Sequence, residues 1–271
     1  RRMDCRKKTR TSRKHLIYRL LMEGVLRNIR LIVQFDGTDF CGWQMQADQR
    51  TVQGDLTEAL SKLTGQSLTL HASSRTDAGV HALAMPVSFR IDSNLPLKAF
   101  VMGTNRFLNK DVQVMSAVEM PLDFHARFTA REKTYEYRIQ LGPVAKPLER
   151  RFAWHVFGHL DLEAMTDAAT RMVGLHDFSA FRSAQCDALS PVRTLKRVDV
   201  QAKGADLVTI EVESGGFLRN MVRIIAGTLV AVGQRKRPPA WIDELLESGD
   251  RTKGGQTAPP QGLFLKSVRY P

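Results

Sequence analysis

The pattern of apolar and polar positions predicts a layer of strands and helices in the first half of the chain. The run 30–35 is rich in β-forming residues and ends in the turn 36–38. Helical spacing of apolar residues after a Thr51 N-cap predicts a helix that Gly65 ends. Further elements follow in the order strand, strand, helix, strand: at 68–70, through Ile91, from Pro96 to Leu108, and from Val112. This order is typical of an α+β layer with helices on one side of a largely antiparallel sheet.

The second half repeats this organisation after a polar stretch near 121–132, where we place a domain boundary. A strand, a helix capped by Asp161, a hairpin around Lys203-Gly204 and an apolar helical stripe from Leu218 to Leu229 follow in order. A short helix at 241–246 and a terminal strand complete the pattern. We therefore expect two similar α+β domains, 23–122 and 123–271, with mainly antiparallel sheets that meet at a central cleft, after a basic and disordered tail over residues 1–22.

The charge of the chain is concentrated in that tail. The formal net charge is +12, and residues 1–21 hold nine Lys or Arg and one Asp, hence +8, which leaves +4 for the remaining 250 residues. A basic arm that follows phosphates is one interpretation of the tail. Because Met22-Glu23-Gly24 resembles a natural start, we favour read-through from an upstream start or an expression remnant. The body of the chain, meaning residues 22–271, is only mildly basic.

Several classes of protein are disfavoured by composition. No apolar run approaches the length of a bilayer-spanning helix, so we expect a soluble protein without a membrane partner. The three cysteines, Cys5, Cys41 and Cys186, lack the spacing of a zinc site or a disulfide framework, and a reducing cytoplasm fits best. Because no phosphate-binding loop, nucleotide motif or metal-ligand cluster is found, we expect neither a cofactor nor a metal.

The stretch 73–82, Ser-Ser-Arg-Thr-Asp-Ala-Gly-Val-His-Ala, is the main candidate for chemistry. It reads as a loop between two half-buried strands, where reactive groups are often displayed. Asp77 has Arg75 two residues away, and such a cation keeps a carboxylate ionised when a substrate excludes water. Gly79 allows a turn that directs Asp77 into a cleft. An ionised carboxylate can act as a nucleophile, although the same residues also form ordinary solvated turns.

Residues 75–82 resemble the catalytic signature of the tRNA pseudouridine synthase A (TruA) family, in which the aspartate is the catalytic nucleophile. Further pieces that resemble the family follow in its order from about Leu31 to Pro271. The resemblance implies the pseudouridine synthase fold. It also implies that Asp77 is the nucleophile, that Tyr135 lies against the target uracil, and that Arg223 pairs with Asp77. In the last block, 257–265, only the resemblance supports a role for Leu263, as apolar surface against the uracil.

Other residues in these blocks have competing interpretations. Packing is favoured over RNA stacking for Phe40 and Trp43, and a core position for Tyr137. Arg182 is a candidate phosphate contact, and Arg75 is expected to position RNA or the loop. Arg219 lies four residues before Arg223, so we expect the two side chains to share a helix face. We expect Arg219 to be solvated.

The expected function is isomerisation of uridine to pseudouridine in tRNA. The family targets positions 38, 39 and 40 of the anticodon stem-loop, and its members are homodimers, so we expect both here. A non-catalytic tRNA-binding or tRNA-folding protein on the same fold is the alternative, because it needs the basic cleft but not Asp77. A hydrolase would need a metal cluster or a second positioned carboxylate near Asp77, and the sequence indicates neither.

Overall fold

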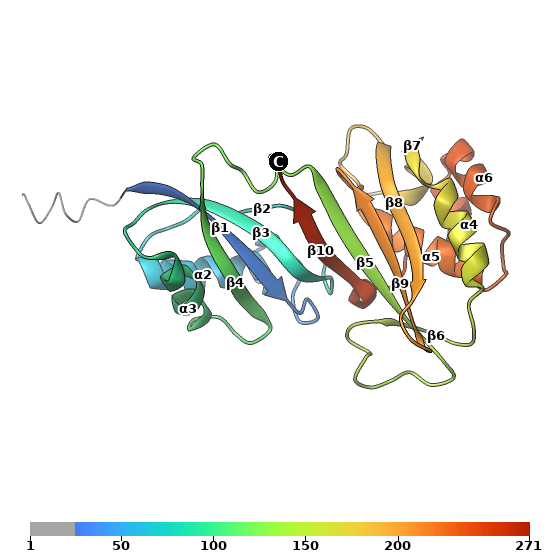
Figure 1. Cartoon of the computed structure of the whole chain (residues 1–271), viewed down its shortest axis with the longest axis horizontal. Coiled ribbons are helices and arrows are strands. Elements are labelled where there is room, and N and C mark those ends of the chain that lie inside the picture. The colour runs from blue at the N-terminus through green and yellow to red at the C-terminus, as the bar shows by residue number, and fades with distance from the viewer. Residues whose placement is uncertain (1–24) are drawn as a thin grey trace, which may run out of the picture.

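A single ten-stranded sheet organises the computed structural model, which describes residues 25–271 (Figure 1). The predicted disordered tail over residues 1–22 lies outside the described residues. The main path of the sheet runs β4-β1-β3-β10-β5-β9-β8-β7, with β2 paired to β3 and β6 paired to β5. The pairs are antiparallel except β10 with β3 and β5 with β6. The predicted α+β class with a largely antiparallel sheet is confirmed.

The first half follows the predicted order of elements: β1 (Leu26–Phe35), α2 (Val52–Thr64), β2 (His71–Ala72), β3 (His81–Asp92), α3 (Leu97–Asn105) and β4 (Val112–Met120). The Thr51 side chain accepts a hydrogen bond from the Gly54 amide, and Gly65 takes the left-handed conformation that ends α2. The strand expected at 68–70 is instead the two-residue β2, just beyond it. Leu68 and Leu70 are still buried, because they pack in the core without joining the ladder.

The second half also contains the predicted helices and hairpin: β5 (Glu132–Leu141), β6 (Trp154–Val156), α4 (Leu162–Arg171), β7 (Gly174–Asp177), β8 (Val192–Ala202), β9 (Leu207–Ser214), α5 (Met221–Gly233), α6 (Trp241–Ser248) and β10 (Leu263–Arg269). Asp161 caps α4 through the Ala164 amide, as expected. The helix α5 begins at Met221, because Asn220 has a left-handed φ of 61° that interrupts the helical run. Arg219 therefore precedes the helix. The prediction that Arg219 and Arg223 share a helix face was wrong.

The last strand, β10, connects the two halves of the sheet. Leu265 pairs in parallel with Ala82 in β3 and antiparallel with Tyr135 in β5. Neighbouring strands lie about 4.8 Å apart, so β10 brings the start of β3 to within two strand spacings of β5. Residues 73–80, here called the signature loop, lead into β3 and thus lie near Tyr135. The division at residues 122 and 123 stays a prediction, because this sheet continues across it.

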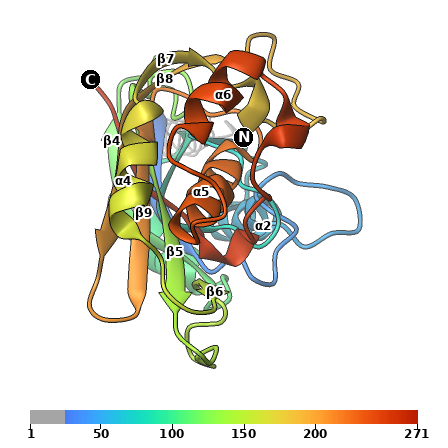
Figure 2. The same ribbon diagram turned by 90° about the vertical axis from the view of Figure 1, so that its right-hand side faces the viewer.

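The helices cover one face of the sheet, as Figure 2 shows for α2, α5 and α6. In β5, Tyr135 and Tyr137 point to this face, whereas Glu136 points to the other, because side chains alternate along a strand. On that other face Glu136 pairs with Lys266 and with Arg138. The helix face therefore holds the apolar core, and the opposite face carries paired charges.

Replacing Gly227 in α5 with Ala should destabilise the fold. A Cβ at this position would overlap the carbonyl oxygen of Gln256, in the segment that leads to β10. Ala favours a helix over Gly by about 1 kcal/mol, but a clash with backbone costs more, so we expect a net loss of about 2 kcal/mol. Thermal unfolding followed by circular dichroism should show a melting temperature lower by about 4–8 °C.

Gly216→Ala is the matched control for Gly227→Ala. An added Cβ at Gly216 meets no atom within 4 Å, so its melting temperature should stay close to that of the parent protein. Equal melting temperatures for the two variants would show that the Gln256 segment does not pack tightly on α5.

Candidate active site

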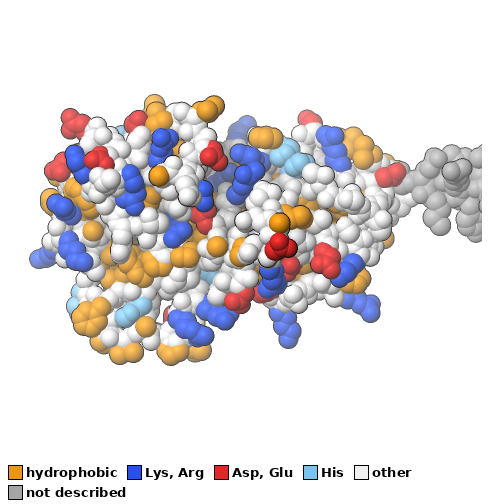
Figure 3. Space-filling model, turned by 180° about the vertical axis from the view of Figure 1, so that it is seen from behind, with side chains coloured by type: hydrophobic (Ala, Val, Ile, Leu, Met, Phe, Trp, Pro, Cys, Tyr) orange, Lys and Arg blue, Asp and Glu red, His pale blue; other side chains and the backbone are white. Residues whose placement is uncertain are grey.

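A cavity of about 1170 Å³ opens on the helix face of the sheet, between its two halves. Its walls come from the signature loop, from the segment before α2, from the turn before β5 together with β5, and from the start of α5. Figure 3 shows a hollow near the middle of this face, with Lys and Arg side chains gathered in it. The cavity is large enough for more than one ring of a polar ligand.

The signature loop is fixed by the segment 37–43 that packs against its backbone. The Trp43 amide donates to the Thr76 carbonyl oxygen over 3.0 Å. Gly42 has a φ of 86°, and a Cβ there would lie 2.5 Å from the same oxygen. Phe40 and Trp43 are 3% and 2% exposed, which confirms the prediction that they pack in the core. The loop is therefore held at a defined position above the sheet.

His81, the histidine of the signature, has a structural role. Its Nδ1 accepts a hydrogen bond from the Gly37 amide over 2.9 Å, and its Nε2 lies 3.2 Å from the Gln261 carbonyl oxygen. Burial lowers the pKa of His81, and this effect outweighs the opposite influence of Asp36, so the imidazole is neutral at pH 7. The ring thereby ties three distant segments together.

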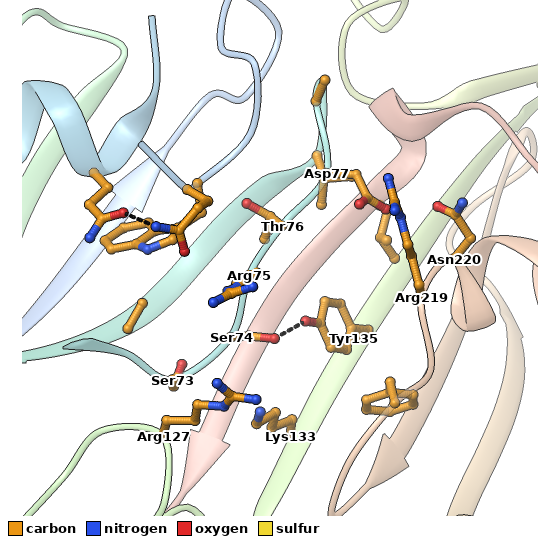
Figure 4. A pocket seen from close by; sticks show the side chains of 18 of the residues that line it. Ser73, Ser74, Arg75, Thr76, Asp77, Arg127, Lys133, Tyr135, Arg219 and Asn220 are labelled. Atoms are coloured by element: carbon orange, nitrogen blue, oxygen red, sulfur yellow. Dashed lines mark hydrogen bonds between the residues drawn. The ribbon is translucent and has the colours of Figure 1, made fainter. Parts of the chain in front are cut away.

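Asp77 lies at the cavity wall opposite the start of α5 (Figure 4). Its side chain is 38% exposed, and its Oδ2 lies 3.9 Å from Nη1 of Arg223. This distance is an electrostatic contact rather than a hydrogen bond. Among residues 25–271, no ion pair joins Arg75 to Asp77; the exposed Arg75 side chain lines the cavity instead. The cation beside the carboxylate is Arg223, whose pairing with Asp77 the family resemblance implied.

Arg223 is held in place by groups on both sides of it. Its Nε donates to the Ala258 carbonyl oxygen over 2.7 Å, and its Nη1 donates to Oδ1 of Asn220 over 3.0 Å. The Ala258 amide in turn donates to the Arg223 carbonyl oxygen. Burial lowers the pKa of Arg223 and the Asp77 charge opposes this change, so the guanidinium remains cationic at neutral pH. Its position is thus fixed before any substrate binds.

Tyr135 projects from β5 into the cavity, between the two halves of the sheet. Its hydroxyl lies 2.8 Å from Oγ of Ser74, and its ring meets Phe217 edge-on at 5.1 Å between centroids. Burial raises the pKa of Tyr135 to about 12, with a further contribution from the Asp77 charge. Ser74 and Phe217 were not singled out as site residues from the sequence, because the contacts that define them join separate segments.

The other candidate residues differ in whether they line the cavity. The Tyr137 hydroxyl donates to the Pro259 carbonyl oxygen over 2.7 Å, and its buried ring confirms the prediction of a core residue. Leu263 is 7% exposed and lines the cavity, and its contact with the uracil stays a prediction. Arg182 is not among the residues that line the cavity. Its predicted role as a phosphate contact therefore gains no support from its position.

Five residues that the sequence did not single out as site residues line the other end of the cavity: His71, His125, Arg127, Phe128 and Lys133. Figure 4 shows Arg127 and Lys133 side by side, on the side of Tyr135 away from Asp77. Burial and the Arg127 charge lower the pKa of Lys133 to about 8. The crowding of basic residues near 125–133 is visible in the sequence, but its place in the cavity is not.

The Tyr135 phenol should stay protonated far above the usual tyrosine range. Because its pKa is about 12 in the folded protein and near 10 when exposed, the unfolded chain releases this proton first. This residue therefore lowers stability as the pH rises from about 10 to 12 and has no such effect below. Phenolate absorbance at 295 nm, compared between parent and Tyr135→Phe, should differ by one titration centred near pH 12. A difference centred near pH 10 would contradict the buried environment.

Metal-ligand clusters and membrane spans are absent from the described part of the chain. Residues 25–271 contain no group of three or more His, Cys, Asp or Glu side chains arranged to hold a metal ion. None of the helices within this range combines the length and the apolar character needed to cross a bilayer.

Comparison with known proteins gives one consistent family. A family model described as tRNA pseudouridine synthase matches residues 31–129 and 168–271. A protein from Citrifermentans bemidjiense named tRNA pseudouridine synthase A is 47% identical over 246 residues, covering 90% of this chain and 98% of that one. A protein of the same name from Geotalea daltonii is 48% identical, covering 90% of this chain and 100% of that one. Another from Myxococcus xanthus is 43% identical, covering 89% of this chain and 91% of that one.

Proposed function

The chain belongs to the tRNA pseudouridine synthase A family, and we infer that it isomerises uridine to pseudouridine in tRNA with Asp77 as its nucleophile. In this reaction the bond between uracil N1 and ribose C1′ breaks, the base turns, and a bond forms between C5 and C1′. The proton on C5 is released and N1 gains one, so substrate and product are isomers. No redox change and no net hydrolysis take place.

The observation that carries the assignment of Asp77 is its pairing with Arg223 at the wall of the cavity. Attack on the base and action at the ribose both need a carboxylate, and Arg223 provides a fixed opposite charge that orients it. Tyr135 faces the same space from β5, and Leu263 adds apolar surface from the start of β10. A uridine turned out of the RNA stack would find stacking and apolar contacts there, which offset the few kcal/mol of unstacking.

We further propose that the target uridines are positions 38, 39 and 40 of the anticodon stem-loop. The full-length similarity to proteins named tRNA pseudouridine synthase A supports a tRNA substrate. Transcripts that each keep a single uridine at one of these positions would map the target. Modification confined to uridines outside the anticodon stem-loop would contradict the assignment of positions while leaving the reaction intact.

A cytoplasmic homodimer is part of the same proposal. The body carries a formal charge of only +4 outside residues 1–21, since +12 less +8 is +4, which is weak for one subunit that must grip a tRNA. Two subunits would double the basic surface available to one tRNA. Sedimentation equilibrium at micromolar concentration should give twice the mass of one chain, and a monomer with full activity would contradict the proposal.

The reaction itself is tested by tritium release. Purified protein is incubated, without added cofactor, with an unmodified tRNA transcript that carries tritium at uracil C5. Release of tritium with retention of the nucleoside as pseudouridine is the expected result. Binding of the transcript without any release would favour the alternative, a tRNA-binding or tRNA-folding protein on this fold.

A further inference from the structure

The end of the cavity beyond Tyr135 holds an aromatic cluster that the isomerisation chemistry does not use. The ring centroids of His71 and His125 lie 4.5 Å apart, and those of His125 and Phe128 lie 4.4 Å apart. Phe128 is 76% exposed although it is a large apolar side chain. The His125 ring meets the Phe128 ring at an angle of 38°, and the Arg127 guanidinium carbon lies 5.5 Å from the centre of the Phe128 ring. An aromatic ring that is held among such groups and still largely exposed is suited to stack on a planar group.

Hydrogen bonds hold the turn that carries His125 and Phe128. The amide of Arg127 donates to Nδ1 of His125 over 3.1 Å, and the His125 amide donates to Oγ1 of Thr129 over 3.0 Å. The carbonyl oxygen of Ala126 accepts a hydrogen bond from Tyr270 near the end of the chain. Burial, together with the neighbouring His71, lowers the pKa of His125, so its ring is neutral at pH 7 and can stack. The backbone that carries Phe128 is therefore held in place at this end of the cavity.

Two cations beside the cluster have no acidic partner among residues 25–271. Neither Lys133 nor Arg127 forms an ion pair there, although Lys133 is half-buried. On the opposite face of the same sheet, Lys196 pairs with Glu132, and Lys266 pairs with Glu136 and Glu211. Burying a cation without a partner costs free energy, because the charge loses contact with water. An anionic ligand that pairs with the cation offsets this desolvation free energy. A phosphate group can accept charge-assisted hydrogen bonds from both Lys133 and Arg127.

The cluster lies close to the proposed uridine pocket. Lys133 and Tyr135 are two residues apart on β5 and point to the same face, which separates them by about 7 Å along the strand. Figure 3 shows pale-blue histidine and orange hydrophobic side chains beside the blue Lys and Arg side chains at the rim of the hollow. Both positions therefore line the same cavity.

We propose that this end of the cavity is a second nucleotide subsite, in which Phe128 backed by His125 stacks on an unpaired base next to the target uridine. Lys133 and Arg127 bind the phosphate of that nucleotide. The proposal rests on the proposed function, because it assumes an RNA substrate in the same cavity. It assigns part of the RNA affinity to base stacking, which tolerates different bases, and part to a phosphate contact, which depends on salt.

The test uses the Asp77→Asn protein as a common background, so that binding is measured without turnover. Filter binding of the tRNA transcript is followed from low to moderate salt. Phe128→Ala should weaken binding about tenfold at every salt concentration, with the salt dependence unchanged. Lys133→Met should weaken binding most at low salt, and the slope of log K against log salt should fall by about 0.7, the value for one phosphate contact on a single strand.

Matched controls separate these effects from general ones. Phe107→Ala removes an exposed phenylalanine, and Lys98→Met removes an exposed lysine on α3, both outside the cavity lining. Neither should change affinity or slope. Phe128→Trp keeps an aromatic ring and should restore binding, whereas Phe128→Leu should not, which distinguishes stacking from a role in folding. Circular dichroism is used to check that each variant is folded.

The inference is overturned if Phe128→Ala binds as tightly as Phe107→Ala, or if Lys133→Met keeps the slope of the parent. Either result leaves the reaction unaffected, because tritium release by the protein with Asp77 intact is measured separately. Absence of tritium release from that protein would instead overturn the proposed function.

Discussion

Asp77→Asn should abolish tritium release from C5-labelled tRNA, with a loss of at least about 10⁴-fold in kcat. The amide has nearly the same shape as the carboxylate, but it is neutral and cannot act as the nucleophile. It also loses the ionic attraction to Arg223, which lies 3.9 Å from the carboxylate. Because Asp77 makes only part of the cavity wall, binding of the transcript should be retained. Single-turnover assays with enzyme in excess measure the chemical step directly.

Asp39→Asn is the matched control for this variant. The Asp39 side chain is 61% exposed, it does not line the cavity, and it forms a surface ion pair with Arg151. Such pairs contribute at most about 1 kcal/mol, so activity and stability should be close to those of the parent. Tritium release by Asp77→Asn at the parental rate would rule out the carboxylate as the essential group.

Arg223→Lys should reduce kcat by about 10²-fold, with little change in KM. Lysine keeps the positive charge but lacks the planar fork. It therefore cannot donate to Ala258 and Asn220 while it faces Asp77. The effect should fall on kcat because the Arg223 side chain is only 16% exposed, and we expect it to orient Asp77 rather than to hold RNA. Arg223→Met, which also removes the charge, should lose about 10³-fold.

Arg235→Lys, just beyond the end of the same helix, is the control for Arg223→Lys. Its side chain is 81% exposed and pairs with Asp161 at the surface. Kinetic constants should match those of the parent protein. A kcat for Arg223→Lys equal to that of the parent would show that the geometry of the guanidinium is not required, and that any cation near Asp77 is sufficient.

Predictions that depend on neighbouring residues in the chain were confirmed. The Thr51 cap and the Gly65 end of α2 follow from backbone groups within one turn of the helix. The hairpin of β8 and β9 follows from two alternating runs joined by a short turn at Lys203-Gly204. The chemistry of such elements is local, so spacing in the sequence is enough to predict them. The Asn220 turn was missed, because a left-handed residue before a helical stripe leaves no apolar signal.

The family, the fold class and the candidate catalytic residues Asp77, Tyr135 and Arg223 were determined by the sequence alone, through a motif and its flanking blocks. Tertiary structure decided which groups surround them. It brings Arg223, the partner that the family resemblance implied, to Asp77 and leaves Arg75 without an ion pair to that carboxylate, because β10 aligns β3 with β5 and the segment before β10 packs on α5. It also left Lys133 half-buried without an acidic partner within residues 25–271. These contacts join segments far apart in the chain, and their energies depend on burial, which sequence spacing does not encode.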